Sequence, residues 1–120
     1  EAALGQGLRN KLRWLAAMPI IDLTNQAFQD LDDIAEAIGR ERPATAEDFL
    51  AAAEKSFELL ACFPKLGPLA GFSNPMNVDL RSWPIKSGWP YLSFYRPLED
   101  GIEVVRVFDC RRDYPKLFEE

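Results

Sequence analysis

Three strand-like runs within residues 77–113 decide the fold: Leu80-Arg81-Ser82-Trp83-Pro84-Ile85, Tyr91-Leu92-Ser93-Phe94-Tyr95-Arg96 and Ile102-Glu103-Val104-Val105-Arg106-Val107-Phe108-Asp109. Each is rich in the β-branched and aromatic residues that favour an extended backbone. They are separated by Lys86-Ser87-Gly88-Trp89-Pro90 and by a loop that ends Glu99-Asp100-Gly101, both typical of turns. The pattern predicts an antiparallel meander with strands near residues 77–85, 91–97 and 102–109.

Alternation along these strands predicts which side chains share a face of the sheet. Leu92 and Phe94 should lie on one face of the second strand. The third strand should place four side chains together, Ile102, Val104, Arg106 and Phe108.

The residues before the meander predict a short strand and two helices. Residues 18–23 are strand-like, and Thr24 or Asn25 can cap a helix near residues 25–39. A second helix is expected near residues 46–63, because Thr45-Ala46-Glu47-Asp48 resembles a capping box. The two helices should pack together through their apolar stripes, which are Ala27, Leu31, Ile34, Ala35 and Ile38, and Phe49, Leu50, Ala53, Phe57, Leu60 and Ala61.

The first predicted helix also carries an acidic cluster, Asp30, Asp32, Asp33 and Glu36, mostly opposite its apolar stripe. Paired carboxylates can bind a metal or exchange protons. An acidic face on an amphipathic helix is more commonly solvated surface, and we expect that here.

Charge is distributed unevenly along the chain, which has 120 residues and a net charge of −5. Residues 18–64 carry three basic and ten acidic side chains, whereas residues 65–120 carry eight of each. Proteins that grip RNA or DNA usually present a basic surface, because phosphate contacts supply most of the non-specific affinity. The composition therefore predicts one domain with a single core and argues against a nucleic-acid-binding protein.

The chain contains no histidine, the residue most often used as a metal ligand and as an acid–base group at neutral pH. Cys62 and Cys110 show no metal-ligand spacing, and we expect two reduced, buried thiols. No run approaches the ~20 apolar residues of a membrane span. These features predict a cytoplasmic protein without a metal or other cofactor.

Residues 1–17 precede the predicted domain, residues 18–120, as an extension. Leu4, Leu8, Leu12 and Leu15 recur at helical spacing and form one apolar stripe. The extension is either a passive tail, for example one translated from an upstream start codon, or a docking helix. A docking helix would contact its own domain or a second copy of the chain, which would then be a homodimer.

Taken in order, the motifs of residues 19–115 resemble the RelE/ParE superfamily of bacterial toxins. The shared features are an Asp-Leu-x-x-Ile pattern in the first helix, Pro64-Lys65-Leu66-Gly67 after the second, and the Leu-Arg-Ser-Trp-Pro, Phe-Tyr-Arg and Val-Val-Arg-Val-Phe strands. The helix pattern is matched by Asp30-Leu31-Asp32-Asp33-Ile34 or by Asp33-Ile34 alone. The resemblance implies an α+β fold, with an N-terminal strand and a two-helix hairpin packed on a twisted antiparallel sheet of about four strands. It also implies the toxin of a type II toxin–antitoxin (plasmid stabilization) system, bound by a ParD-like antitoxin.

One branch of the superfamily, the RelE-like branch, cleaves messenger RNA on the ribosome. That reaction needs a base, an acid and cations that bind the phosphate. Arg81 would be the phosphate clamp, and the residues that would assist it are Arg106, Asp109, Tyr114, Arg111 and Lys86. Asp109 stands where many relatives carry His, and an exposed Asp, with a usual pKa near ~3.9, is a poor proton donor at neutral pH.

The other branch, the ParE-like branch, poisons DNA gyrase and is not a nuclease. The missing histidine, the net charge and Asp109 favour this branch. A third interpretation is an inactive toxin fold that only binds antitoxin. In the favoured interpretation, the antitoxin contacts Arg81, Arg96, Arg106 and Trp83, and gyrase contacts Arg111, Arg112 and Tyr114.

The arginines also have a purely structural interpretation. They could pair across and beyond the sheet with its acidic residues, which are Asp79, Glu103, Asp109 and Asp113.

Overall fold

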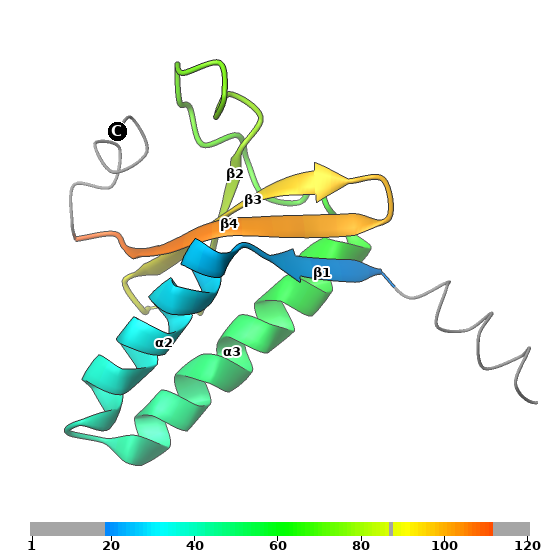
Figure 1. Cartoon of the computed structure of the whole chain (residues 1–120). Helices are drawn as coiled ribbons and strands as arrows, with labels where there is room; N and C mark the ends of the chain where they lie inside the picture. Colours follow the sequence, from blue (N-terminus) through cyan, green and yellow to red (C-terminus); the bar gives the residue numbers. More distant parts are fainter. Residues whose placement is uncertain (1–18, 87, 112–120) are drawn as a thin grey trace, which may run out of the picture.

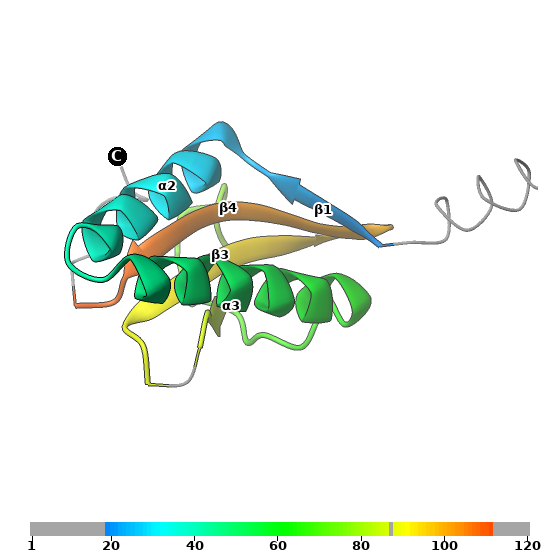
Figure 2. The same cartoon turned by 90° about the horizontal axis from the view of Figure 1, so that it is seen from below.

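A computed structural model describes residues 19–86 and 88–111. Its elements are, in order, β1 (Ile20–Leu23), α2 (Asn25–Gly39), α3 (Pro43–Cys62), β2 (Arg81–Pro84), β3 (Tyr91–Leu98) and β4 (Gly101–Asp109). The α2–α3 hairpin covers one face of the sheet (Figures 1 and 2). The α+β fold expected from the sequence is confirmed.

The sheet has the strand order β1-β4-β3-β2. Strands β2, β3 and β4 form the predicted antiparallel meander, but β1 pairs with β4 in parallel, so the sheet is mixed. Only strands joined by a tight hairpin must be antiparallel, and β1 is separated from β4 by all the other elements. Gly101 permits the pairing, because a side chain there would collide with the backbone oxygen of Ile20.

A β-bulge in β4 changes which residues face the helices. Phe94 lies opposite Arg106 and Tyr95 lies opposite Val104, so Val105 is an extra residue. Val107 therefore joins Ile102 and Val104 in the core between the sheet and the helices. The prediction that Arg106 and Phe108 share the face of Ile102 and Val104 was wrong, because an inserted residue reverses the alternation.

The helix boundaries match the predictions at α2 and differ at α3. Thr24 caps α2, its Oγ1 accepting a hydrogen bond from the Ala27 amide at 3.0 Å. The capping box predicted at Thr45 was wrong, because α3 begins at Pro43 after Arg42, without a side-chain cap. Proline suits the first turn of a helix, since its fixed φ is helical and the missing N–H would have no partner there.

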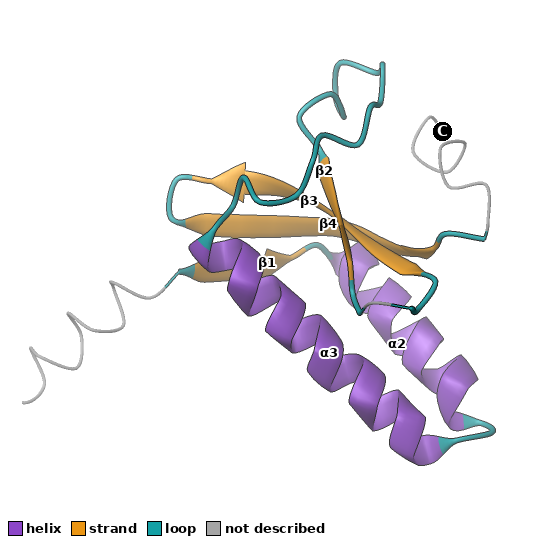
Figure 3. Cartoon of the chain, turned by 180° about the vertical axis from the view of Figure 1, so that it is seen from behind, coloured by secondary structure: helices purple, strands orange, loops and turns teal. Residues whose placement is uncertain are grey.

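Strand β2 is shorter than the predicted strand near residues 77–85. The preceding residues form a turn, in which the Leu80 amide donates to the Asn77 carbonyl at 3.1 Å. The long loop between α3 and β2 extends to the side of the sheet opposite the helices (Figure 3). Phe72 from this loop packs on Phe94, which in turn contacts Phe108.

Two further expectations concern the surface. Cys62 and Cys110 are free thiols, but both are exposed, so the expectation that they are buried was wrong. Cys62 ends α3 and Cys110 follows β4, where the chain leaves the core. Within the described part of the chain, no helix combines the length and the apolar character needed to cross a membrane.

Candidate partner-binding site

Arg106 is held by an acidic residue of α2. Its Nε and Nη2 donate to the two carboxylate oxygens of Asp30 at 2.8 and 3.0 Å. The guanidinium also lies over the ring of Phe108, 4.2 Å from the centroid. The Asp30 side chain is only 9% exposed, so its predicted place on a solvated helix face was wrong.

This ion pair lies at the edge of the sheet, where side chains hydrogen-bond to the β4 backbone in place of a neighbouring strand. β1 ends at Leu23, so the outer edge of β4 loses its strand partner beyond Val104. Thr24 Oγ1 donates to the Val105 carbonyl at 2.8 Å, and Asp30 accepts from the Val107 amide at 3.0 Å. Two side chains thus replace the missing strand, which satisfies backbone groups that would otherwise be costly to bury.

Arg81 is also engaged within the domain. Its Nη1 donates to the Gly67 carbonyl at 2.7 Å and to the Lys65 carbonyl at 3.4 Å. The same loop is held by Tyr95, whose hydroxyl donates to Pro64 O at 2.7 Å and accepts from the Gly67 amide at 2.9 Å. Burial raises the pKa of Tyr95 above its ordinary value. Arg81 and Tyr95 therefore anchor the loop at residues 64–67 to the sheet.

Arg96 joins β3 to its neighbours. It donates to Asp79 at 3.2 and 3.3 Å and to Glu103 at 3.2 Å. A further bond reaches the Met76 carbonyl at 3.0 Å. These contacts agree with the structural interpretation of this arginine.

Asp109 and Arg111 pair with each other at the end of β4. Arg111 Nη2 donates to Asp109 Oδ2 at 2.6 Å, and this hydrogen bond raises the pKa of Arg111. The Arg111 side chain is 70% exposed. Arg112, Asp113 and Tyr114 lie outside the described residues.

The arginines assigned to nucleic-acid cleavage do not converge on one point. Arg81 lies on β2 beside the loop at residues 64–67, whereas Arg106 lies two strands away on β4 and points to α2. Each also donates to an oxygen of the protein itself. The geometry therefore offers no preassembled phosphate clamp within the described residues.

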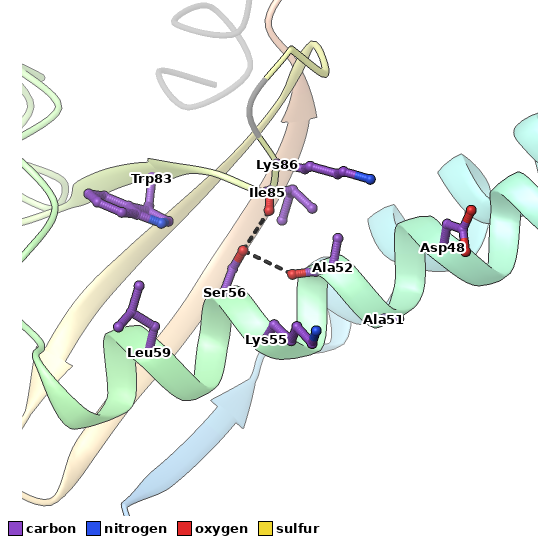
Figure 4. A pocket seen from close by; sticks show the side chains of 9 residues that line it. All are labelled: Asp48, Ala51, Ala52, Lys55, Ser56, Leu59, Trp83, Ile85 and Lys86. Carbon is purple, nitrogen blue, oxygen red and sulfur yellow. Dashed lines mark hydrogen bonds between the residues drawn. The ribbon is translucent and has the colours of Figure 1, made fainter.

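Trp83 lines a groove between α3 and β2, which we call the Trp83 groove (Figure 4). The groove has a volume of about 490 Å³. Its lining residues are Asp48, Ala51, Ala52, Lys55, Ser56 and Leu59 from α3, and Trp83, Ile85 and Lys86 from β2 and the turn after it. Ser56 links the two sides, because its single hydroxyl proton lies between two carbonyl oxygens, Ile85 O at 2.7 Å and Ala52 O at 3.0 Å from Oγ.

The Trp83 groove combines apolar groups, two cationic groups and one carboxylate, that of Asp48. Trp83 and Leu59 supply apolar surface, and Leu59 is 41% exposed. Lys55 and Lys86 supply two ammonium groups, and Lys86 Nζ lies 4.8 Å from the centroid of the Trp89 ring. Such a groove suits a segment with apolar anchors and negative charge.

Sequence reasoning selected Trp83 but missed its α3 partners. The apolar stripe used to place α3 runs through Phe49, Ala53 and Phe57 and faces the core. Ala52, Ser56 and Leu59 form a second, narrower stripe beside it. That spacing was readable in the sequence, but nothing there showed that β2 would lie against it.

Residues 21–114 match the model of the family described as "ParE toxin of type II toxin-antitoxin system, parDE". The chain belongs to the ParE toxin family. A comparison with curated proteins gives no significant match. Among solved structures, a chain from the chromosomal ParDE toxin–antitoxin system of P. aeruginosa superposes with a TM-score of 0.61 and 19% identity. The match covers 78% of this chain and 97% of that one, and it shows that the two chains share a fold.

Proposed function

We propose that this ParE-family chain inhibits growth by binding DNA gyrase and is neutralised by a cognate ParD-like antitoxin. Family membership over residues 21–114 supports a toxin of the ParE branch. The alternative toxin activity is ribosome-dependent cleavage of messenger RNA.

The observation that favours gyrase binding over RNA cleavage is that the arginines are already hydrogen-bonded within the domain. Arg81 is bound to loop carbonyls, and Arg96 and Arg106 are bound to carboxylates. A phosphate would have to displace these partners before it could be clamped. The chain also has no histidine to transfer protons.

The antitoxin is proposed to place an acidic, partly apolar segment in the Trp83 groove. Trp83 and Leu59 can receive an apolar anchor, while Lys55 and Lys86 lie where a carboxylate can reach them. The groove lining has two lysines and one acid, Asp48, whereas residues 18–64 as a whole carry far more acids than bases. The groove is therefore a weakly positive site within an acidic part of the chain. Complementary charge of this kind speeds association and selects the partner.

Gyrase is proposed to contact the segment that begins at Arg111. This side chain is exposed just after the end of β4, and Arg112 and Tyr114 follow in sequence. A cationic segment next to a rigid sheet can contact a partner without changes in the core.

Induced expression in bacteria tests this function. Gyrase poisoning should produce DNA damage and filamentation, and the purified chain should trap cleaved DNA–gyrase complexes. Rapid translation arrest with messenger RNA cut at A-site codons would replace this proposal with the nuclease. Normal growth, together with antitoxin binding, would indicate an inactive binding module.

A further inference from the structure

We propose that residues 4–15 form a helix that docks, within the same chain, into an apolar groove between β1, α2 and α3. We call this the β1 groove, and it has a volume of about 220 Å³. Its lining residues are Ile21, Leu23, Leu31, Leu50, Ala53, Glu54 and Phe57. It is distinct from the Trp83 groove, with which it shares no residue.

The β1 groove exposes apolar surface that a soluble domain normally covers. Glu54 is the only lining residue with a polar side chain. Ile21 is 38% exposed and Leu50 is 45% exposed, and both line the groove together with core residues of the helices. An occupant with a narrow row of aliphatic side chains would remove this surface from water.

The segment that precedes β1 has such a row. Leu4, Leu8, Leu12 and Leu15 fall within one narrow stripe if residues 4–15 are helical. A helix of this length spans roughly 18 Å at ~1.5 Å per residue. The groove residues Leu50 and Phe57 are seven positions apart on α3, or roughly 10 Å, so the segment is long enough to cover them.

Connectivity places the segment next to the groove. β1 itself contributes Ile21 and Leu23, and Ile21 comes two residues after Pro19. Residues 16–19 would form the turn that brings the helix back over β1, a length common for such connections. A segment joined this closely meets the groove at a high effective concentration, which favours docking in the same chain over a second copy.

Charge also matches between the segment and the groove rim. Glu47, Glu54 and Glu58 lie with Leu50 along one exposed side of α3, and no ion pair among the described residues involves them. On the predicted helix, Lys11 and Arg9 lie on either side of the leucine stripe. Docked by its leucines, the helix would bring these bases toward the acidic rim.

Hydrogen exchange of the full chain tests the docking, with two matched variants. Leu50→Glu adds charge in the β1 groove, whereas Leu59→Glu changes a leucine of α3 outside it that is almost as exposed, 41% against 45%. Amides of residues 8–15 should exchange at least tenfold more slowly than in an unstructured peptide. Leu50→Glu should abolish this protection, and Leu59→Glu should preserve it. Unprotected amides in the unsubstituted chain, or equal effects of the two variants, would overturn the proposal.

Disulfide trapping separates docking in the same chain from docking on another copy. In a Cys62→Ser, Cys110→Ser background, Leu8→Cys with Leu50→Cys should form a disulfide within one chain on mild oxidation. Asn10→Cys with Leu50→Cys is the control, because Asn10 lies on the opposite side of the predicted helix. Disulfide-linked dimers would assign the groove to a second copy and would overturn the proposal. Equal trapping of Asn10→Cys would also overturn it.

Discussion

Arg106 on β4 and Asp30 on α2 form a two-point ion pair, 76 residues apart in sequence, with donor–acceptor distances of 2.8 and 3.0 Å. Asp30 also accepts a hydrogen bond from the Val107 amide, so one carboxylate serves the side chain and the backbone of the bulged strand. The pair therefore fixes α2 against β4 where β1 has ended. This position makes Arg106 a structural residue of the domain.

Loss of Asp30 should destabilise the domain. Asp30→Ala leaves a partly buried guanidinium and the Val107 amide without their partner. The expected loss in the free energy of unfolding is about 2–4 kcal/mol, measured by urea denaturation. Asp32→Ala, at an exposed position of the same helix, should change it by less than about 0.5 kcal/mol. A loss at Asp30 no larger than that at Asp32 would contradict the structural role.

Tyr95 should make the domain less stable at alkaline pH. Burial raises the pKa of its hydroxyl above the ordinary value of 10.0, so the folded state retains a proton that the unfolded state releases. Its contribution is complete below about pH 10 and decreases as the pH rises through the folded-state pKa. Tyr95→Phe should reduce this decrease, measured by urea denaturation from pH 8 to 11. A pH dependence unchanged in Tyr95→Phe would show that another group causes it.

Gly67 should not tolerate a side chain. A Cβ atom there would lie 2.6 Å from the Ser82 carbonyl oxygen on β2 and 2.7 Å from the Tyr95 hydroxyl, which is itself hydrogen-bonded to Pro64 and Gly67. Gly67→Ala should therefore cost about 1–3 kcal/mol, measured by thermal unfolding. Gly39→Ala is the control, because its Cβ would make an ordinary contact with Ala46 at 3.5 Å. Equal stability of the two variants would refute the close approach.

The sequence contained enough local information to predict the elements. Thr24 is a typical N-cap, and the meander has recognisable turns, so α2, β3 and β4 fall close to their predicted residues. The parallel pairing of β1 could not be predicted from local pattern, because it depends on long-range packing. The bulge at Val105 was hidden for another reason: Val104 and Val105 are identical, so the sequence does not show where the alternation reverses.

The candidate site was less predictable than the fold. Pairing of arginines with Asp79, Glu103 and Asp109 was predicted and is found. The Arg106–Asp30 pair was not predicted, because it depends on α2 meeting β4, and Asp30 was assigned to solvent for that reason. Trp83 was selected as an aromatic residue of a strand that could contact a partner, and it is partly buried. Its groove partners Lys55 and Leu59 lie on α3 and required the three-dimensional arrangement.

The Trp83 groove should determine antitoxin affinity. Trp83→Ala removes the largest apolar side chain of the groove, and a buried aromatic anchor is typically worth at least 2 kcal/mol, or about thirtyfold in Kd. Lys55→Ala with Lys86→Ala should weaken binding less, and mainly at low salt, because exposed charges are screened at high ionic strength.

Lys65→Ala changes an exposed lysine outside the Trp83 groove and is the control. Calorimetric titration of the folded variants with the gene-adjacent antitoxin, at two salt concentrations, measures each Kd and its salt dependence. If Trp83→Ala binds as tightly as Lys65→Ala, the antitoxin uses another surface, and Arg111 at the exposed end of β4 becomes the next position to test.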